Sequence, residues 1–177
     1  MRTVDLTAAE RHPPIVETEV RSLSWASEQD TQAFAERLAA HPSIVNAFIE
    51  LHGELGAGKT TLVRHILRAL GVQGRIKSPT YAVVEPYVLR QAQDERELAI
   101  WHFDFYRFSD PREWEDAGFR DLFASPGLKL AEWPEKAGAL LPRADLVVRI
   151  DVDADGGSET RHVTLTAQTA TGRDLLA

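Results

Sequence analysis

The sequence predicts an α/β fold in which helices flank a central mixed β-sheet, with a parallel core and an antiparallel edge. Residues 44–70 are typical of a buried strand, a glycine-rich turn and a helix in succession. Strands and helices continue to alternate through the first part of the chain, which favours a parallel sheet. Residues 145–151 and 161–167 then form two strands joined by a polar turn, which indicates antiparallel pairing.

The chain has 177 residues, which is enough for one domain with a sizeable core. We expect an N-terminal extension over residues 1–18, a single domain over 19–168 and a frayed C-terminal tail over 169–177.

Composition narrows the possible functions. The chain is 44% hydrophobic and 27% charged, as an ordinary globular protein is, and it has no cysteine, which excludes a thiol nucleophile, a disulfide and a thiolate metal site. The formal net charge of −7 argues against a broad nucleic-acid surface, because such a surface needs clustered Lys and Arg. No apolar run approaches membrane-spanning length, and residues 1–10 lack the apolar core of a signal peptide, so we expect no membrane association and a cytoplasmic location.

The first strand is expected over residues 19–23. Ser27 is typical of a helix N-cap, with the acidic Asp30 at the third helical position, and Pro42 marks the exit from that helix. The strand over 44–51 follows and leads into the glycine-rich turn.

Residues 53–60 have the sequence Gly-Glu-Leu-Gly-Ala-Gly-Lys-Thr, which matches the phosphate-binding loop pattern G-x-x-x-x-G-K-[ST]. The strand over 44–51 precedes this loop, and a helix over 61–70 follows it and ends at Gly71, which is the context that the pattern needs. A glycine-rich turn that contains Lys-Thr by chance is the alternative, but four specified positions and both flanking elements favour the phosphate-binding loop. We therefore expect a layered fold like that of the P-loop NTPases.

Each part of this loop has a physical task in binding a polyphosphate. The glycines let the backbone turn tightly and aim its N–H groups inward, and the following helix adds its N-terminal partial positive charge. Lys59 is expected to reach the β- and γ-phosphates, and the Thr60 hydroxyl to bind Mg²⁺. The predicted nucleotide-binding residues are Gly53, Glu54, Leu55, Gly56, Ala57, Gly58, Lys59, Thr60 and Thr61.

The second half of the chain alternates strands with short helices. We expect strands over 81–87, 98–103 and 127–133, helices starting at Pro111 and running over 119–123 and 134–141, and an exposed polar connection over 91–97. Asp104 and Glu132 follow or end two of these strands, where ligands bind in open sheets. From the residues alone, solvated acids at both positions are equally good interpretations, and Thr80 is more simply a residue at the start of a strand.

Four stretches together resemble the TsaE family, the small P-loop ATPases needed for threonylcarbamoyladenosine modification of tRNA. They are residues 53–64, Ser78-Pro79-Thr80-Tyr81, His102-Phe103-Asp104-Phe105-Tyr106-Arg107 and Glu132-Trp133-Pro134-Glu135. The order and spacing of these stretches are similar to those of the family over residues 19–167.

The resemblance implies an ATPase that uses ATP and Mg²⁺ and resets a complex containing the TsaD and TsaB proteins, with tRNA reached only through that complex. It implies catalytic roles for Lys59, Asp104 and Glu132, and metal binding by Thr60, Thr80, Asp104 and Glu132. Thr80 would approach Mg²⁺ or the γ-phosphate, Asp104 would hold Mg²⁺ or orient the attacking water, and Glu132 would activate water or hold a metal-bound water. No [NT]-K-x-D segment that would select guanine is present, so the sequence does not support GTP.

Two other functions stay open. A P-loop small-molecule kinase needs an acceptor pocket and a lid, which Arg107, Arg112 and Arg120 could supply. A nucleotide-dependent assembly module would bind ATP and hydrolyse it negligibly. Near the predicted site, we expect Trp133 mainly to pack in the core and His102 to make a structural hydrogen bond.

Overall fold

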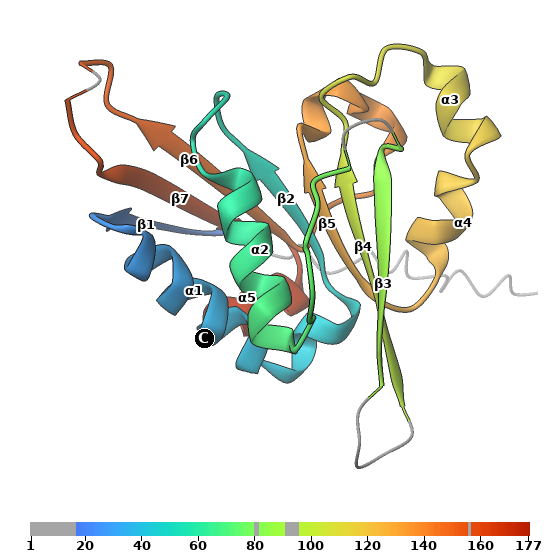
Figure 1. The fold of residues 1–177 in the computed structure, drawn as a ribbon, viewed down its shortest axis with the longest axis horizontal. Helices are drawn as coiled ribbons and strands as arrows, with labels where there is room; N and C mark the ends of the chain where they lie inside the picture. The colour runs from blue at the N-terminus through green and yellow to red at the C-terminus, as the bar shows by residue number, and fades with distance from the viewer. Residues whose placement is uncertain (1–16, 80–81, 91–95, 156) are drawn as a thin grey trace, which may run out of the picture.

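The computed structural model describes residues 17–79, 82–90, 96–155 and 157–177. A single seven-stranded sheet, in the order β1-β7-β6-β2-β5-β4-β3, forms the middle layer (Figure 1). The strands are β1 (Glu19–Trp25), β2 (Phe48–His52), β3 (Val84–Arg90), β4 (Glu97–Asp104), β5 (Leu128–Glu132), β6 (Leu146–Val152) and β7 (Arg161–Ala167).

The four central strands β6, β2, β5 and β4 are parallel to one another. β7 and β1 continue the sheet antiparallel beyond β6, and β3 pairs antiparallel with β4 at the opposite edge. The predicted parallel core is confirmed, and antiparallel strands stand at both edges. The carboxyl ends of β2, β5 and β4 therefore meet along one side of the sheet, which is the upper side in Figure 1.

Helices cover the two faces of the sheet. One face carries α1 (Glu28–Ala40), α2 (Lys59–Leu70) and α5 (Ala170–Leu176), and the other carries α3 (Pro111–Asp116), α4 (Phe119–Ala124) and two 3₁₀ turns, η2 (Pro134–Lys136) and η3 (Gly138–Leu140). Alternate residues of β2 supply the two cores: Ile49 and Leu51 pack under α2, whereas Phe48 packs on the α4 side.

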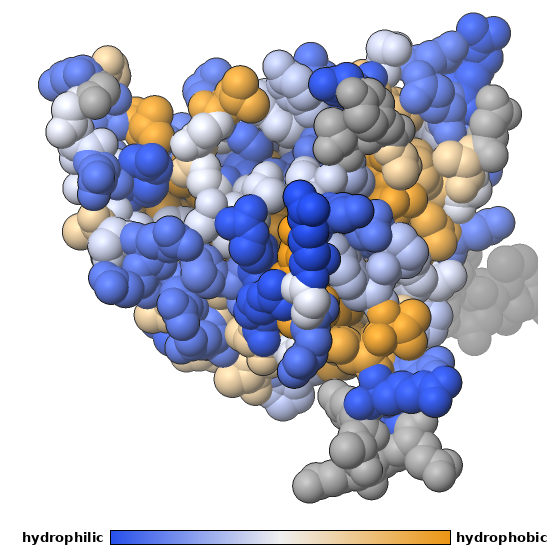
Figure 2. All heavy atoms as spheres, in the orientation of Figure 1, coloured by the Kyte–Doolittle hydropathy of each residue, from blue (hydrophilic) through white to orange (hydrophobic). Residues whose placement is uncertain are grey.

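The outer surface of the α1 and α2 layer is mostly hydrophilic, with apolar residues visible in smaller separate areas (Figure 2). Within the part of the chain that the structure describes, no helix combines the length and the apolar character needed to span a bilayer.

The helices next to the loop begin and end as the sequence predicts. The Asp30 carboxylate accepts the backbone N–H of Ser27 at 3.0 Å and closes the start of α1. Gly71, with φ of 104°, ends α2 in the left-handed conformation. The amphipathic face of α2 is fully buried at Leu62, Val63, Ile66 and Leu67.

Three predicted elements are wrong in detail. The strand expected over 81–87 is β3, which begins at Val84 and continues to Arg90. The strand expected over 44–51 begins only at Phe48, because Pro42 starts a 3₁₀ turn, η1 (Pro42–Asn46). The backbone N–H of Ser43 at the start of this turn donates to the His41 side chain. The helix expected over 134–141 is two short 3₁₀ turns, since Gly138 has φ of 54° and interrupts it. The predicted connection over 91–97 and the extension over 1–18 lie largely outside the described residues.

The expected frayed tail is also wrong, because residues 170–176 form the docked helix α5. Leu175 and Leu176 are each only 7% exposed and join the core on the α1 and α2 side. The Thr169 hydroxyl accepts the N–H of Gly172 at 3.2 Å and donates to the Asp145 carboxylate. The same carboxylate accepts the N–H of Phe48 at 2.7 Å, so α5 is tied to the strand that leads to the loop.

Replacing Gly172 by alanine is expected to destabilise the protein by about 2 kcal/mol, because the added methyl would overlap the carbonyl oxygen of Asp145. Urea unfolding measures the effect. Gly157→Ala is the matched control, since its nearest neighbour would lie at 3.9 Å, and we expect it to change stability by less than about 0.5 kcal/mol. Equal unfolding midpoints for the two variants would contradict the docking of α5.

Candidate functional site

The glycine-rich loop joins the carboxyl end of β2 to the start of α2, as the motif requires. Gly53, Gly56 and Gly58 have φ values of 149°, 80° and 110°. Residues other than glycine rarely adopt these positive φ values. A Cβ on Gly53 would also lie 2.5 Å from the carbonyl oxygen of Ile150. The backbone of this loop therefore depends on its glycines, and it directs the chain into the positively polarised end of α2.

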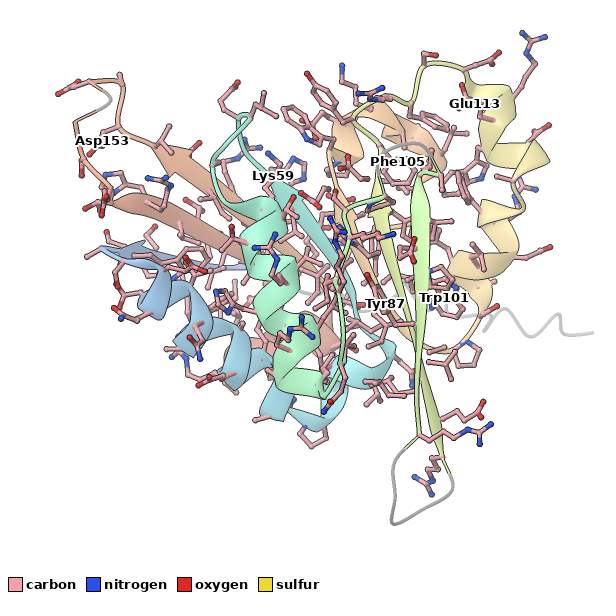
Figure 3. The ribbon with its side chains drawn as sticks, viewed as in Figure 1. Lys59, Tyr87, Trp101, Phe105, Glu113 and Asp153 are labelled. Carbon is pink, nitrogen blue, oxygen red and sulfur yellow. The ribbon has the colours of Figure 1, made fainter. Side chains whose placement is uncertain are left out.

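Lys59 is buried in the first turn of α2, next to the loop (Figure 3). Its ammonium group donates to the carbonyl oxygens of Gly53 and Glu54, the latter at 2.9 Å, and lies 4.1 Å from the centroid of the Trp133 ring. Burial lowers the pKa of Lys59, and nearby carboxylates, first among them Glu132, oppose that change. The Lys59 ammonium group is thus held against the loop. An anion bound in the loop would compete with the Gly53 and Glu54 carbonyl oxygens for this ammonium group.

Glu132 ends β5 and is almost completely buried, with 2% of its surface exposed. One carboxylate oxygen accepts the Thr60 hydroxyl at 2.7 Å, and the other lies 2.6 Å from Nε2 of His102. Both oxygens therefore have hydrogen-bond partners, which is what allows a carboxylate to be buried here.

Asp104 lies beside Glu132, since the two residues are register partners on β4 and β5. Its carboxylate accepts the backbone N–H of Tyr106 at 3.0 Å and the Ser78 hydroxyl at 3.2 Å. Burial raises the pKa of Asp104; the Tyr106 N–H opposes the change and the Glu132 charge adds to it. The two acids thus place closely spaced negative charge at the carboxyl ends of adjacent strands.

These groups converge on one cavity of about 330 Å³. It is lined by Leu55, Gly56, Gly58, Lys59, Thr60, Thr61, Ser78, Asp104, Tyr106, Glu132 and Trp133. The structure therefore brings together most of the residues predicted from the sequence. Gly53, Glu54 and Ala57 are in the loop but do not line this cavity, and Thr80 lies outside the described residues.

The donors in the cavity are hydroxyl and carboxylate oxygens, the ligands that Mg²⁺ prefers. No cluster of three or more His, Asp or Glu that could hold a metal ion occurs in the described ranges. A site with two carboxylates fits an ion that takes its remaining ligands from phosphate and water, as Mg²⁺ does.

Ser78, Tyr106 and Trp133 line the cavity although they are not among the site residues predicted from the sequence. Trp133 packs against the core on the α4 side, as expected. Its left-handed backbone, with φ of 54°, also places the ring over Lys59 and 5.0 Å from the Tyr106 ring. The only local signal for Trp133 is its place after the acid that ends β5. The expected hydrogen bond of His102 is confirmed, and its partner is Glu132.

A second cavity of about 180 Å³ lies against the other side of the loop. It is lined by Trp25, Ser27, Glu28, Thr31, Gly56, Ala57, Gly58, Thr61, Glu159 and Arg161. It shares Gly56, Gly58 and Thr61 with the first cavity, so the two adjoin at the loop. Arg161 donates to the carbonyl oxygen of Ala57 at 3.0 Å and ties β7 to the loop.

Comparison with known proteins gives consistent matches. The sequence model of the family described as "Threonylcarbamoyl adenosine biosynthesis protein TsaE" matches residues 25–163. The TsaE protein of Haemophilus influenzae is 42% identical over 144 residues, and the match covers 81% of this chain and 85% of that protein. The TsaE protein of Bacillus subtilis is 31% identical over 150 residues, and the match covers 84% of this chain and 87% of that protein. Both relatives are described as tRNA threonylcarbamoyladenosine biosynthesis proteins. The crystal structure of YdiB of Bacillus subtilis has the same fold, with a TM-score of 0.68 and 24% identity, covering 91% of this chain and 94% of its own.

Replacing Asp104 by asparagine is expected to raise the urea midpoint of the ligand-free protein at pH 7. A carboxyl group whose pKa is raised on folding binds its proton more tightly in the folded state, so its ionised form opposes folding. The destabilisation by ionised Asp104 grows as the pH rises from the ordinary aspartate pKa to the raised pKa. Above the raised pKa it is complete. The stabilisation by asparagine should therefore shrink as the pH falls toward the ordinary aspartate pKa.

Asp155→Asn, in an exposed turn, is the control for this experiment. It should leave the midpoint unchanged across the same pH range. A lower midpoint for Asp104→Asn at pH 7 would show that the ionised Asp104 carboxylate stabilises the fold.

Proposed function

The chain belongs to the TsaE family of threonylcarbamoyladenosine biosynthesis proteins, and from this premise we propose that it is a Mg²⁺-dependent ATPase that supports this modification of tRNA. One observation carries the proposal: Lys59, Thr60, Asp104 and Glu132 converge on a single cavity beside a phosphate-binding loop. An ammonium group, a hydroxyl group and two carboxylates are the groups that metal-assisted phosphoryl transfer needs.

The triphosphate would occupy the 330 Å³ cavity. There the N–H groups of the loop and of the first turn of α2 would donate to phosphate oxygens. Lys59 would exchange its bonds to the Gly53 and Glu54 carbonyls for bonds to phosphate, which are stronger because both partners are charged.

Mg²⁺ would be held by the Thr60 hydroxyl and the Asp104 carboxylate, and by Glu132 through a bound water, with Thr80 as a further proposed ligand. When bound, the ion neutralises charge on the phosphate oxygens. The carboxylates of Asp104 and Glu132, next to the ion, would orient the attacking water and accept hydrogen bonds from it. Catalysis would then come mainly from positioning and from charge stabilisation.

The nucleoside would lie in the second cavity, on the far side of the loop from the two acids. Gly56, Gly58 and Thr61 line both cavities, so a nucleotide that spans them keeps contact with the loop. Among its polar side chains, Ser27 and Thr31 offer hydroxyl groups to a base or ribose, beside the charged Glu28, Glu159 and Arg161. ATP remains the proposed nucleotide because the chain belongs to the TsaE family; GTP has no support, since the sequence contains no [NT]-K-x-D segment.

The proposed role of hydrolysis is to reset a complex of the TsaD and TsaB proteins, with tRNA reached only through that complex. The net charge of −7 supports action through protein partners, since a chain of this charge is poorly suited to grip tRNA by itself. A kinase lid gains no support, because none of Arg107, Arg112 and Arg120 lines the cavity, and Arg112 pairs with Asp110 at 2.8 Å.

Lys59→Ala is expected to weaken ATP binding by about 30-fold, which corresponds to the loss of about 2 kcal/mol of charge-assisted hydrogen bonding. Titration with a fluorescent ATP analogue measures this change. Lys136→Ala, which removes an exposed lysine of the η2 turn, is the matched control and should bind as the wild type does. Unchanged affinity in Lys59→Ala would remove the phosphate-binding role from this residue.

Glu132→Gln is expected to lower the rate of ATP hydrolysis by about 100-fold or more, while ATP binding changes little, because a carboxylate that orients water acts mainly in the transition state. Phosphate release is measured for the purified chain alone and with TsaB, TsaD and tRNA. Glu135→Gln is the matched control, since Glu135 is close in sequence, 48% exposed and outside the cavity. Chelation of Mg²⁺ should abolish turnover.

The same assay separates the alternatives. Turnover that partners stimulate and that Glu132→Gln loses supports the proposed ATPase. ADP formation that requires a small-molecule acceptor would instead indicate a kinase. Partner binding that is equal with ATP and with a non-hydrolysable analogue, together with wild-type function of Glu132→Gln, would indicate an assembly module.

A further inference from the structure

His102 is a fully buried polar residue near the cavity that the proposed function does not yet use. It lies on β4, has no exposed surface, and its Nε2 is 2.6 Å from a carboxylate oxygen of Glu132. It does not line the cavity. Its contact with the site is therefore made through Glu132.

The hydrogen-bond partners define which ring nitrogen carries a proton. An ionised carboxylate can only accept a hydrogen bond, so we assign the proton of this short bond to Nε2 of His102. The other ring nitrogen, Nδ1, has no hydrogen-bond partner among the described residues. A buried nitrogen without a partner is unfavourable, so a residue that served the core alone would be better apolar. The bond to Glu132 is the interaction here that needs an imidazole.

The register of the sheet explains why the two side chains meet. His102 pairs with Leu130, and Asp104 pairs with Glu132, so His102 is the diagonal neighbour of Glu132 on the same face. This face is the one that α2 covers, as the packing of Ile100 and Leu130 shows. The imidazole thus approaches Glu132 from within the sheet, whereas Thr60 approaches it from the helix.

The two oxygens of Glu132 are thereby given different tasks. Oε2 is held in the interior by His102, and Oε1 accepts the Thr60 hydroxyl at the wall of the cavity. Without His102, Oε2 would be a buried carboxylate oxygen without a partner, and the carboxylate would be free to rotate toward another one.

We propose that His102 is a positioning residue that fixes the Glu132 carboxylate in one orientation, with Oε1 alone presented to Thr60 and the cavity. This inference rests on the proposed function, in which Glu132 orients the attacking water. We therefore expect replacement of His102 to lower the rate of hydrolysis and to leave nucleotide binding unchanged. The hydrogen bonds of Lys59 go to the Gly53 and Glu54 carbonyls, and the hydrogen bond of the His102 ring goes to Glu132.

His102→Leu is expected to lower kcat by about 10- to 100-fold, as loss of a supporting hydrogen bond typically does, with the Kd for ATP unchanged. His102→Gln can still donate a hydrogen bond and should recover part of this loss. Ile100→Ala is the matched control, because Ile100 is fully buried on the same face of β4, two residues away. It should lose stability by cavity formation while keeping the wild-type kcat.

A double-mutant cycle tests whether His102 acts through Glu132. In a Glu132→Gln background, His102→Leu should lower kcat no further. The inference would be overturned if the losses in kcat from His102→Leu and Glu132→Gln were additive in the double variant. It would also be overturned if His102→Leu kept the wild-type kcat while Glu132→Gln was inactive. The second result would leave the proposed function standing.

A spectroscopic measurement tests the inference without relying on turnover. In the ligand-free protein labelled with ¹⁵N-histidine, the ring signals of His102 should show a proton on Nε2 and none on Nδ1. The Nε2 proton should shift strongly in Glu132→Gln and stay in place in Glu135→Gln. A proton found on Nδ1 alone would overturn the positioning role. If the chain did not hydrolyse ATP under any condition, the proposed function would fail. The NMR measurement would still show whether Nε2 of His102 donates a hydrogen bond to Glu132.

Discussion

The hydrogen-bond chain from Thr60 through Glu132 to His102 is the interaction on which the rest of the site depends. It joins the first turn of α2 to β5 and β5 to β4, and it does so inside the protein, where Glu132 is only 2% exposed. A buried carboxylate is tolerated only when its oxygens have partners, so the position of each element is constrained by the needs of this one group. The helix, the strand and the neighbouring strand cannot shift independently.

The fold supplies this constraint through parallel pairing. Because β2, β5 and β4 are parallel and in register, Leu51, Glu132 and Asp104 come to the same edge of the sheet. The chain then leaves β2 through the glycine-rich loop, which must pass within contact distance of the Ile150 carbonyl and so excludes a side chain at Gly53. Apolar cores on both faces of the sheet hold these edges in place.

Much of this arrangement could be predicted from the sequence, because it depends on local patterns. The loop and α2 follow from a motif with fixed spacing, and Asp104 and Glu132 follow from acids at the ends of apolar strands. The position of Trp133 over Lys59 could not be predicted, since it requires a left-handed backbone at a residue that rarely adopts one. The bond between His102 and Glu132 joins two residues 30 positions apart and depends on the register of β4 and β5. Thr80 stays a prediction.

The Thr60 hydroxyl resolves an apparent conflict between two roles. It donates its proton to Glu132 in this structure, and the proposed function also makes it a ligand of Mg²⁺. A hydroxyl group has one proton and two lone pairs, so it can donate to a carboxylate and offer a lone pair to a cation at the same time. The bond to Glu132 would then increase the electron density on the oxygen that faces the ion, as acceptors behind metal ligands do. Glu132 would thus support the ion through Thr60 and through water, and His102 would support Glu132 in turn.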